Sequence, residues 1–252
     1  MSNALAIAVF DFRGAWRNGS AWLLLAVAGA MLAWGFLHRI DAFTDGVEQR
    51  ATVSDAPGVG ELVTAPHLAN TAWLLLLLAP LVTLRSIGDE HRRGTLDALH
   101  AAGVRPLAVV VGKWLGATAL LMFVATLALA MAASLAAGSV FDGGRLIAAA
   151  AGLSMLAASL GAIGVASSAV FRQPAVAAAG AYATQFFLWL VDSPARARGV
   201  TDGLINFLAM PTHVGPFLRG VVSVGDAIWL VALTCAALVI AWRRVDWLKA
   251  RG

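Results

Sequence analysis

The sequence predicts an all-α integral membrane protein with six transmembrane helices. Hydrophobic residues make up 60% of the 252-residue chain and charged residues only 13%, and the mean hydropathy of +0.80 lies far above that of soluble domains. A transmembrane helix needs roughly 20 mostly apolar residues in a row. Six such runs occur without any Asp, Glu, Lys, Arg or His, at about 20–37, 68–84, 114–137, 146–170, 175–191 and 227–242.

The polar segments between these runs are short, and no internal repeat divides the chain. We therefore expect a single transmembrane domain over residues 1–252. The run at 20–37 is long enough to span a bilayer and is followed by no small-residue cleavage signature, which favours a retained helix over a signal peptide. The single cysteine, Cys235, lies inside the last run, so an intramolecular disulfide is excluded.

An amphipathic helix is predicted at 4–17, before the first run. The charged residues Asp11, Arg13 and Arg17 fall on other faces than its large apolar residues, which recur at helical spacing. Those apolar residues are Leu5, Val9, Phe12 and Trp16. We expect this helix to lie in the membrane interface, in contact with lipid. The alternative is a plain cytoplasmic extension of the first span.

The distribution of basic residues predicts the orientation in the membrane. With six spans, the termini share one side with the segments that follow the second and fourth spans, and this side carries 12 of the 18 Lys and Arg residues. Because basic residues concentrate in cytoplasmic segments, we expect both termini in the cytoplasm and the multi-pass chain in the inner (cytoplasmic) membrane. This asymmetry also accounts for the sequence pI near 10.2, so nucleic acid is not an expected partner.

The segment between the second and third runs is the most charge-dense part of the chain. Leu96 and Leu99 lie three residues apart on one helical face, and the pair Gly94-Thr95 can end one short helix and cap the next. A charged cytoplasmic hairpin of this kind suits docking into a groove of another protein, with leucines as anchors. The alternative is an ordinary positive-inside loop.

The pattern Glu90-x-x-x-Gly94-Thr95-Leu96-x-x-Leu99, followed by Pro106 and Gly112-Lys113, resembles the coupling segment of type-2 ABC (ATP-binding cassette) transporter permeases. Gly161-Ala162-Ile163-Gly164, Ser167-Ser168 and Gln173 are similar to the fourth and fifth spans of the same family. The ending, with His213, Phe217, Arg219-Gly220-Val221, Asp226 and Arg243-Arg244, is similar to the gliding-motility (GldF) and nitrous-oxide-reductase maturation (NosY) branch.

The resemblance implies the permease subunit of an ATP-driven exporter, or of a complex that passes mechanical work across the membrane. It implies a homodimer or pseudo-dimer with separate ABC ATPase subunits, which bind ATP and Mg, and an external accessory protein as a further partner. The residues expected to couple to the ATPase are Glu90, Arg92, Arg93, Gly94, Thr95, Leu96 and Leu99. Those expected at an external gate are His213, Phe217, Arg219 and Gly220. Tyr182, Gln185 and Trp189 are candidates for the dimer interface or the pathway.

Other chemistry finds little support in the residues. The five histidines show no metal-ligand spacing, and no span carries a paired acid and base, so we expect no metal site, no cofactor bound by this chain and no enzyme activity of its own. The external segment 192–225 is broken by Pro211 and Pro216 and predicts short re-entrant or interfacial helices. Two alternatives stay open: an ABC permease of the haem or cytochrome maturation type, and an ion-coupled secondary carrier.

Overall fold

The computed structural model describes residues 3–47, 58–84, 86–88, 90, 94, 101–137, 142–197, 199 and 203–249. Every regular element in these residues is helical, as predicted. In chain order they are α1 (Asn3–Trp16), α2 (Gly19–Asp45), the π-helix η1 (Gly60–Thr64), α4 (Ala65–Thr83), α7 (Pro106–Ser134), the 3-10 helix η2 (Leu135–Ala137), α8 (Gly143–Val170), α9 (Pro174–Leu190), α10 (Ser193–Arg196), α11 (Leu204–Leu208), α12 (Met210–Leu218) and α13 (Val224–Lys249).

Five of the described helices are long and apolar enough to cross a membrane. They cover Ala21–Asp45, Gly60–Thr83, Pro106–Ala137, Gly143–Val170 and Val224–Lys249. The predicted run at 175–191 forms α9, whose 17 residues make a helix of about 25 Å, the shortest of the six. The structure thus confirms a multi-pass helical membrane protein and five of the predicted spans by length and composition.

Several helices extend beyond the apolar runs that predict them. The run at 20–37 continues as helix to Asp45, and helical structure resumes at Gly60, eight residues before the run at 68–84. A formed helix adds residues at little cost, because each adds a backbone hydrogen bond. The polar residues between these two runs predict an external loop over 38–66. This prediction is wrong at both of its ends, which are helical.

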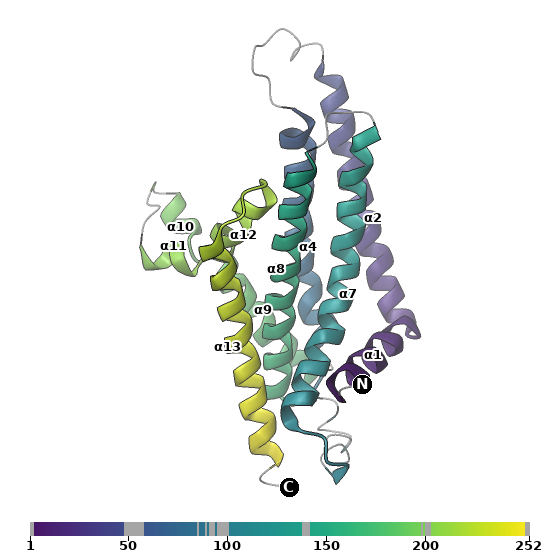
Figure 1. Cartoon of the computed structure of the whole chain (residues 1–252), viewed down its shortest axis with the longest axis vertical. Coiled ribbons are helices and arrows are strands. Elements are labelled where there is room, and N and C mark those ends of the chain that lie inside the picture. The colour runs from purple at the N-terminus through teal and green to yellow at the C-terminus, as the bar shows by residue number, and fades with distance from the viewer. Residues whose placement is uncertain are drawn as a thin grey trace.

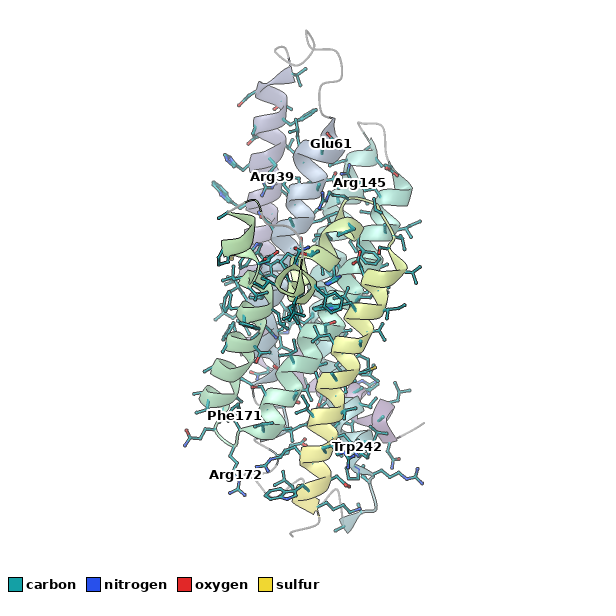
Figure 2. The ribbon with its side chains drawn as sticks, turned by 90° about the vertical axis from the view of Figure 1, so that its left-hand side faces the viewer. Arg39, Glu61, Arg145, Phe171, Arg172 and Trp242 are labelled. Carbon is teal, nitrogen blue, oxygen red and sulfur yellow. The ribbon has the colours of Figure 1, made fainter. Side chains whose placement is uncertain are left out.

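The long helices lie side by side around α8, and α1 crosses the lower end of the bundle (Figure 1). α8 contacts α4, α7, α9, α12 and α13. Both termini lie at the lower end, whereas α10, α11 and α12 lie to one side higher up. Figure 2 labels Arg172 toward the lower end and Arg39 and Arg145 toward the upper end. The lower end therefore gathers α1, the end of α4, the start of α7 and both termini.

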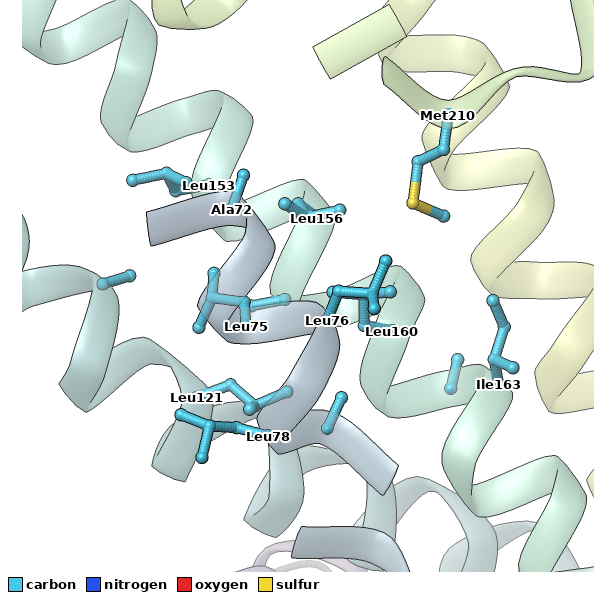
Figure 3. Close-up of a cluster of buried hydrophobic side chains, with 14 of the residues drawn as sticks. Ala72, Leu75, Leu76, Leu78, Leu121, Leu153, Leu156, Leu160, Ile163 and Met210 are labelled. Carbon is cyan, nitrogen blue, oxygen red and sulfur yellow. The ribbon is translucent and has the colours of Figure 1, made fainter. Parts of the chain in front are cut away.

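The core of the bundle is a layer of leucines between α4, α7 and α8. Figure 3 shows Leu75 and Leu76 of α4 facing Leu156 and Leu160 of α8, and all four are fully buried. Met210, at the start of α12, closes the top of this cluster. Lipid is as apolar as these side chains, so the hydrophobic effect does not drive helices together inside a membrane. Dispersion contacts of this kind contribute to holding them together instead.

Glycines on α8 allow its neighbours to approach closely. A Cβ atom on Gly152 would overlap with Cβ of Phe217, and one on Gly164 would overlap with Oγ1 of Thr83. Small residues at such crossings permit backbone-to-backbone packing inside membranes. α8 contacts five other helices. The glycines contribute to this packing, because a residue without a side chain lets a neighbouring helix lie closer.

We expect Gly164→Ala to destabilise the protein by about 1–3 kcal/mol, because the added methyl group overpacks the contact with Thr83. The matched control is Gly35→Ala on α2, where the nearest atom to the new Cβ is 3.9 Å away and the change should stay within about 0.5 kcal/mol. Thermal unfolding in detergent micelles measures both. Equal stability of the two variants would contradict close packing at Gly164.

Candidate functional site

Two glycines near the start of α7 let α1 pack closely against it. This end of the bundle is the one that the basic residues predict to be cytoplasmic. A Cβ atom on Gly112 would lie 2.7 Å from Cβ of Ile7, and one on Gly116 would lie 3.2 Å from Cβ of Asp11. The two glycines are four residues apart and so lie on one face of α7. α1 is therefore packed against the start of α7 as well as lying across the end of the bundle.

An ionic cluster closes this contact. Nζ of Lys113 donates to both carboxylate oxygens of Asp11, at 3.0 and 2.9 Å, and lies 2.5 Å from Oε1 of Glu90. The Lys113 side chain is 8% exposed, whereas those of Asp11 and Glu90 are 24% and 23% exposed. A buried ammonium group needs such partners, because removing it from water unpaired is very costly. The cluster joins three segments: α1, α7 and the segment that follows α4.

The segment after α4 has a second attachment, to the end of α8. The backbone N–H groups of Ile87 and Gly88 donate to Oγ of Ser168, at 3.0 and 3.1 Å. Gly88 has no room for a side chain, since a Cβ atom there would lie 3.1 Å from the carbonyl oxygen of Phe171. The start of the predicted coupling segment is thus fixed to α8 at Ile87–Gly88 and to α1 and α7 at Glu90.

The other residues of the predicted coupling segment are only partly visible. Gly94 has a φ of 72°, a left-handed conformation that favours glycine. Arg92, Arg93, Thr95, Leu96 and Leu99 lie outside the described residues, and their role stays a prediction. No role was predicted from the sequence for Asp11, and Lys113 and Ser168 were predicted only as parts of family motifs. The available signal was Lys113 itself, a lone charge at the mouth of an apolar run.

At the other end of the molecule, His213 joins α11, α12 and α13. Its Nδ1 lies 2.7 Å from Oδ1 of Asp226, and its Nε2 lies 2.8 Å from the carbonyl oxygen of Phe207. The ring stacks on Trp229 at a centroid distance of 4.3 Å and an interplanar angle of 17°. Both ring nitrogens therefore face oxygen atoms, and the histidine fixes α12 between the short helix α11 and the start of α13.

The remaining predicted gate residues follow His213 along α12 and its end. Phe217 is fully buried against Gly152 of α8. Arg219 is exposed, with Nε 3.4 Å from the carbonyl oxygen of Gly215. Gly220 has a φ of 95° and packs against Arg145. All four gate residues lie at one place in the fold, but only His213 and Phe217 point into the bundle.

The three candidates for a dimer interface or pathway all lie on α9 and make contacts within the subunit. Gln185 is fully buried, and its Nε2 donates to the carbonyl oxygen of Leu160 at 3.1 Å. The Tyr182 hydroxyl donates to the carbonyl oxygen of Leu77 at 2.7 Å. Trp189 packs on Trp73 at 5.1 Å and lines a pocket of about 370 Å³ between α4, α9 and α12. A role between subunits stays a prediction.

These features define a class of protein. In the part of the chain that the structure describes, no group of three or more His, Cys, Asp or Glu residues could hold a metal ion. The geometry is that of a multi-pass membrane bundle with an ionic cluster at one end and the helix α12, held by His213, at the other.

The chain belongs to the ABC-2 transporter family, because the family model described as "ABC-2 family transporter protein" matches residues 5–241. The search of curated proteins found no match. Family membership makes the chain the membrane permease of an ABC transporter and implies ABC ATPase subunits as its partners. The predicted family is thus confirmed at the level of the type-2 permeases.

We expect Lys113→Met to destabilise the protein by about 1.5–3 kcal/mol, because the change leaves Asp11 and Glu90 without their shared cation. A double-mutant cycle with Asp11→Asn should give a coupling energy above about 1 kcal/mol. Thermal unfolding in detergent measures all four corners of the cycle. Strictly additive effects would show that the two charges do not interact, and Arg243→Gln, an exposed change on α13, serves as the neutral control.

We expect His213→Phe to loosen α11, because the carbonyl group of Phe207 and the carboxylate of Asp226 both lose their partner while the aromatic stack on Trp229 is kept. Hydrogen exchange at residues 204–208 should rise by at least tenfold, the effect of losing about 1.4 kcal/mol of local stability. His213→Asn is the comparison, since its amide keeps hydrogen-bonding groups. Unchanged exchange in His213→Phe would show that the histidine does not hold α11.

Proposed function

We propose that this chain is the permease subunit of a type-2 ABC exporter that couples ATP hydrolysis by a separate ATPase subunit to substrate export or to mechanical signalling across the membrane. The observation that carries the proposal is the Asp11–Lys113–Glu90 cluster. It joins the segment expected to meet the ATPase to both α1 and α7. A force applied at Glu90 therefore reaches α1 and α7 through ionic contacts of 3.0 Å or less.

α8 supplies a route from this segment to the other end of the molecule. Ser168, near its end, accepts the hydrogen bonds of Ile87 and Gly88, and Gly152, four to five turns earlier, receives the side chain of Phe217. A helix transmits displacement along its axis because its backbone is rigidly hydrogen-bonded. In the proposed cycle, movement of the coupling segment shifts α8 and thereby α12, the re-entrant helix of the external gate.

We further propose that the protein crosses the inner membrane six times and that both of its termini lie in the cytoplasm. Support comes from the course of the chain. α8 ends at the lower end, α9 leads back up to α10–α12, and α13 returns down to the C-terminus (Figure 1). α9 is the fifth span in chain order and brings the number of spans to six. Its length of about 25 Å fits a hydrocarbon layer of roughly 30 Å once its flanking residues are included.

The finer assignment is to the gliding-motility and nitrous-oxide-reductase maturation branch, acting as a homodimer or pseudo-dimer with an external accessory protein. It is supported by the ending of the sequence, since His213 and Asp226, thirteen residues apart, form a direct contact of 2.7 Å. The pair explains why both residue types belong to one motif. The haem-maturation type of ABC permease and the ion-coupled carrier have no comparable feature in their favour.

We expect Leu96→Asp to abolish association with the ATPase, because a charged group replaces an apolar anchor at the predicted docking face. The binding affinity should fall by at least 30-fold, which corresponds to about 2 kcal/mol. Copurification of the ATPase with tagged permease and the stimulated ATP turnover measure the effect. Leu204→Asp, an exposed leucine at the other end of the molecule, is the matched control and should behave as wild type.

Labelling of cysteines tests the orientation that the proposal requires. On a Cys235→Ala background, Arg93→Cys should react only with reagents that reach the cytoplasm, and Leu204→Cys only with reagents added outside. Labelling of Arg93→Cys from the outside would overturn the proposal, as would transport that follows an ion gradient in liposomes without any ATPase.

A further inference from the structure

An apolar crevice of about 390 Å³ lies where α2 meets α4 and α7. Its walls come from the first turns of α2, the last turns of α4 and the middle of α7, with the end of α1 at one edge. Leu25, Leu81 and Leu121 represent these walls, and Asn18, in the turn between α1 and α2, is the only lining residue that is not apolar.

The crevice belongs to the lipid-facing side of the bundle. α2 is the least buried of the five candidate spans, with 17% of its apolar window inside the molecule, and Trp22, Leu23 and Val27 on it are more than half exposed. In a bilayer, the space between these walls is therefore filled by hydrocarbon or by another helix.

The two residues between the lining residues Ala15 and Asn18 both carry hydrogen-bond donors. The indole N–H of Trp16 is shielded from solvent and has no acceptor among the described residues. The ring cannot readily turn to find one, because it packs against Phe123 at 5.0 Å and Trp22 at 4.7 Å. Arg17 is exposed, as is Arg13 one turn earlier. Arg17 and Arg13 are therefore the donors that a head group at this edge of the crevice can reach.

We propose that this crevice binds an anionic phospholipid, with one acyl chain between α2, α4 and α7. The negative charge of the head group lies against Arg17 and Arg13, at the end of α1 that borders the crevice. A transmembrane helix from a second copy fits these donors less well, because its backbone carbonyl groups are already bonded within the helix. The proposed lipid site is independent of ATPase coupling.

Native mass spectrometry of the purified chain tests the site, with phosphatidylglycerol and phosphatidylcholine of the same acyl composition as the two probes. We expect wild type to retain phosphatidylglycerol in preference to phosphatidylcholine. Ala21→Phe, which fills the crevice from α2, should reduce retention of both lipids at least tenfold. Ala26→Phe, an exposed position on the same helix, is the matched control and should leave retention unchanged.

The head-group contact is tested separately. Arg17→Gln should reduce the preference for phosphatidylglycerol about fivefold, the contribution of one basic residue near an anionic membrane surface, while phosphatidylcholine binding stays as in wild type. Arg243→Gln, another exposed arginine near the same end of the bundle, should change neither. Thermal unfolding confirms that each variant is folded before its lipid binding is compared.

Two results would overturn the proposal. One is equal retention of lipid by Ala21→Phe, Ala26→Phe and wild type, all of them folded. The other is efficient disulfide formation between copies of an Ala21→Cys variant on the Cys235→Ala background, which would show that a second copy of the chain occupies the crevice. Loss of both lipids in Ala21→Phe alone, with no such cross-link, supports the lipid site.

Discussion

Close helix packing at the glycines of α8 is the constraint on which the rest of this structure depends. Inside a bilayer, apolar side chains gain little by leaving lipid for protein, so helices associate through close contact of their surfaces. Gly152 and Gly164 provide that contact for Phe217 and Thr83. Phe217 and Thr83 each pack against a glycine at a different position along α8. The central helix α8 is therefore in close contact with α12 and with the end of α4.

The two ends use polar chemistry in different ways. At the lower end, Lys113 is almost buried and is compensated by Asp11 and Glu90, so the cluster ties three segments together through charge. At the upper end, His213 bonds to Asp226 and to a backbone carbonyl group of α11. Groups of this kind are expensive to bury alone and strongly directional when paired. Each therefore fixes the position of a short element that helix packing alone would leave free.

The proposed lipid site involves the same helix, α1, as the ionic cluster. α1 carries Asp11 toward the ionic cluster and ends with Trp16 and Arg17 beside the crevice. Bound lipid and the coupling segment thus contact a single interfacial helix, at positions about one and a half turns apart. In the proposed arrangement, α1 lies in the membrane interface and also receives the ionic contact from the segment proposed to meet the ATPase.

The sequence by itself determined the class, the helical composition and the family. Runs of uncharged apolar residues have no stable form in lipid other than a helix, and the motif from Glu90 to Lys113 identified a type-2 ABC permease. The sequence also pointed to His213 and Phe217, which lie close together in the fold. The predicted end of the first span and the predicted start of the second were wrong, because helices continue into polar sequence wherever backbone hydrogen bonds can still form.

Only the tertiary structure decided which residues meet. Asp11 and Lys113 are 102 residues apart, and Ser168 is 80 residues from Gly88, so no local pattern links them. The crevice beside Trp16 arises from three helices whose sequences are runs of Ala, Leu and Val. Such runs specify hydrophobicity but not shape, and shape comes from how helices cross. That is the physical reason why the membrane character was legible in the chain, whereas the ionic cluster and the lipid site were not.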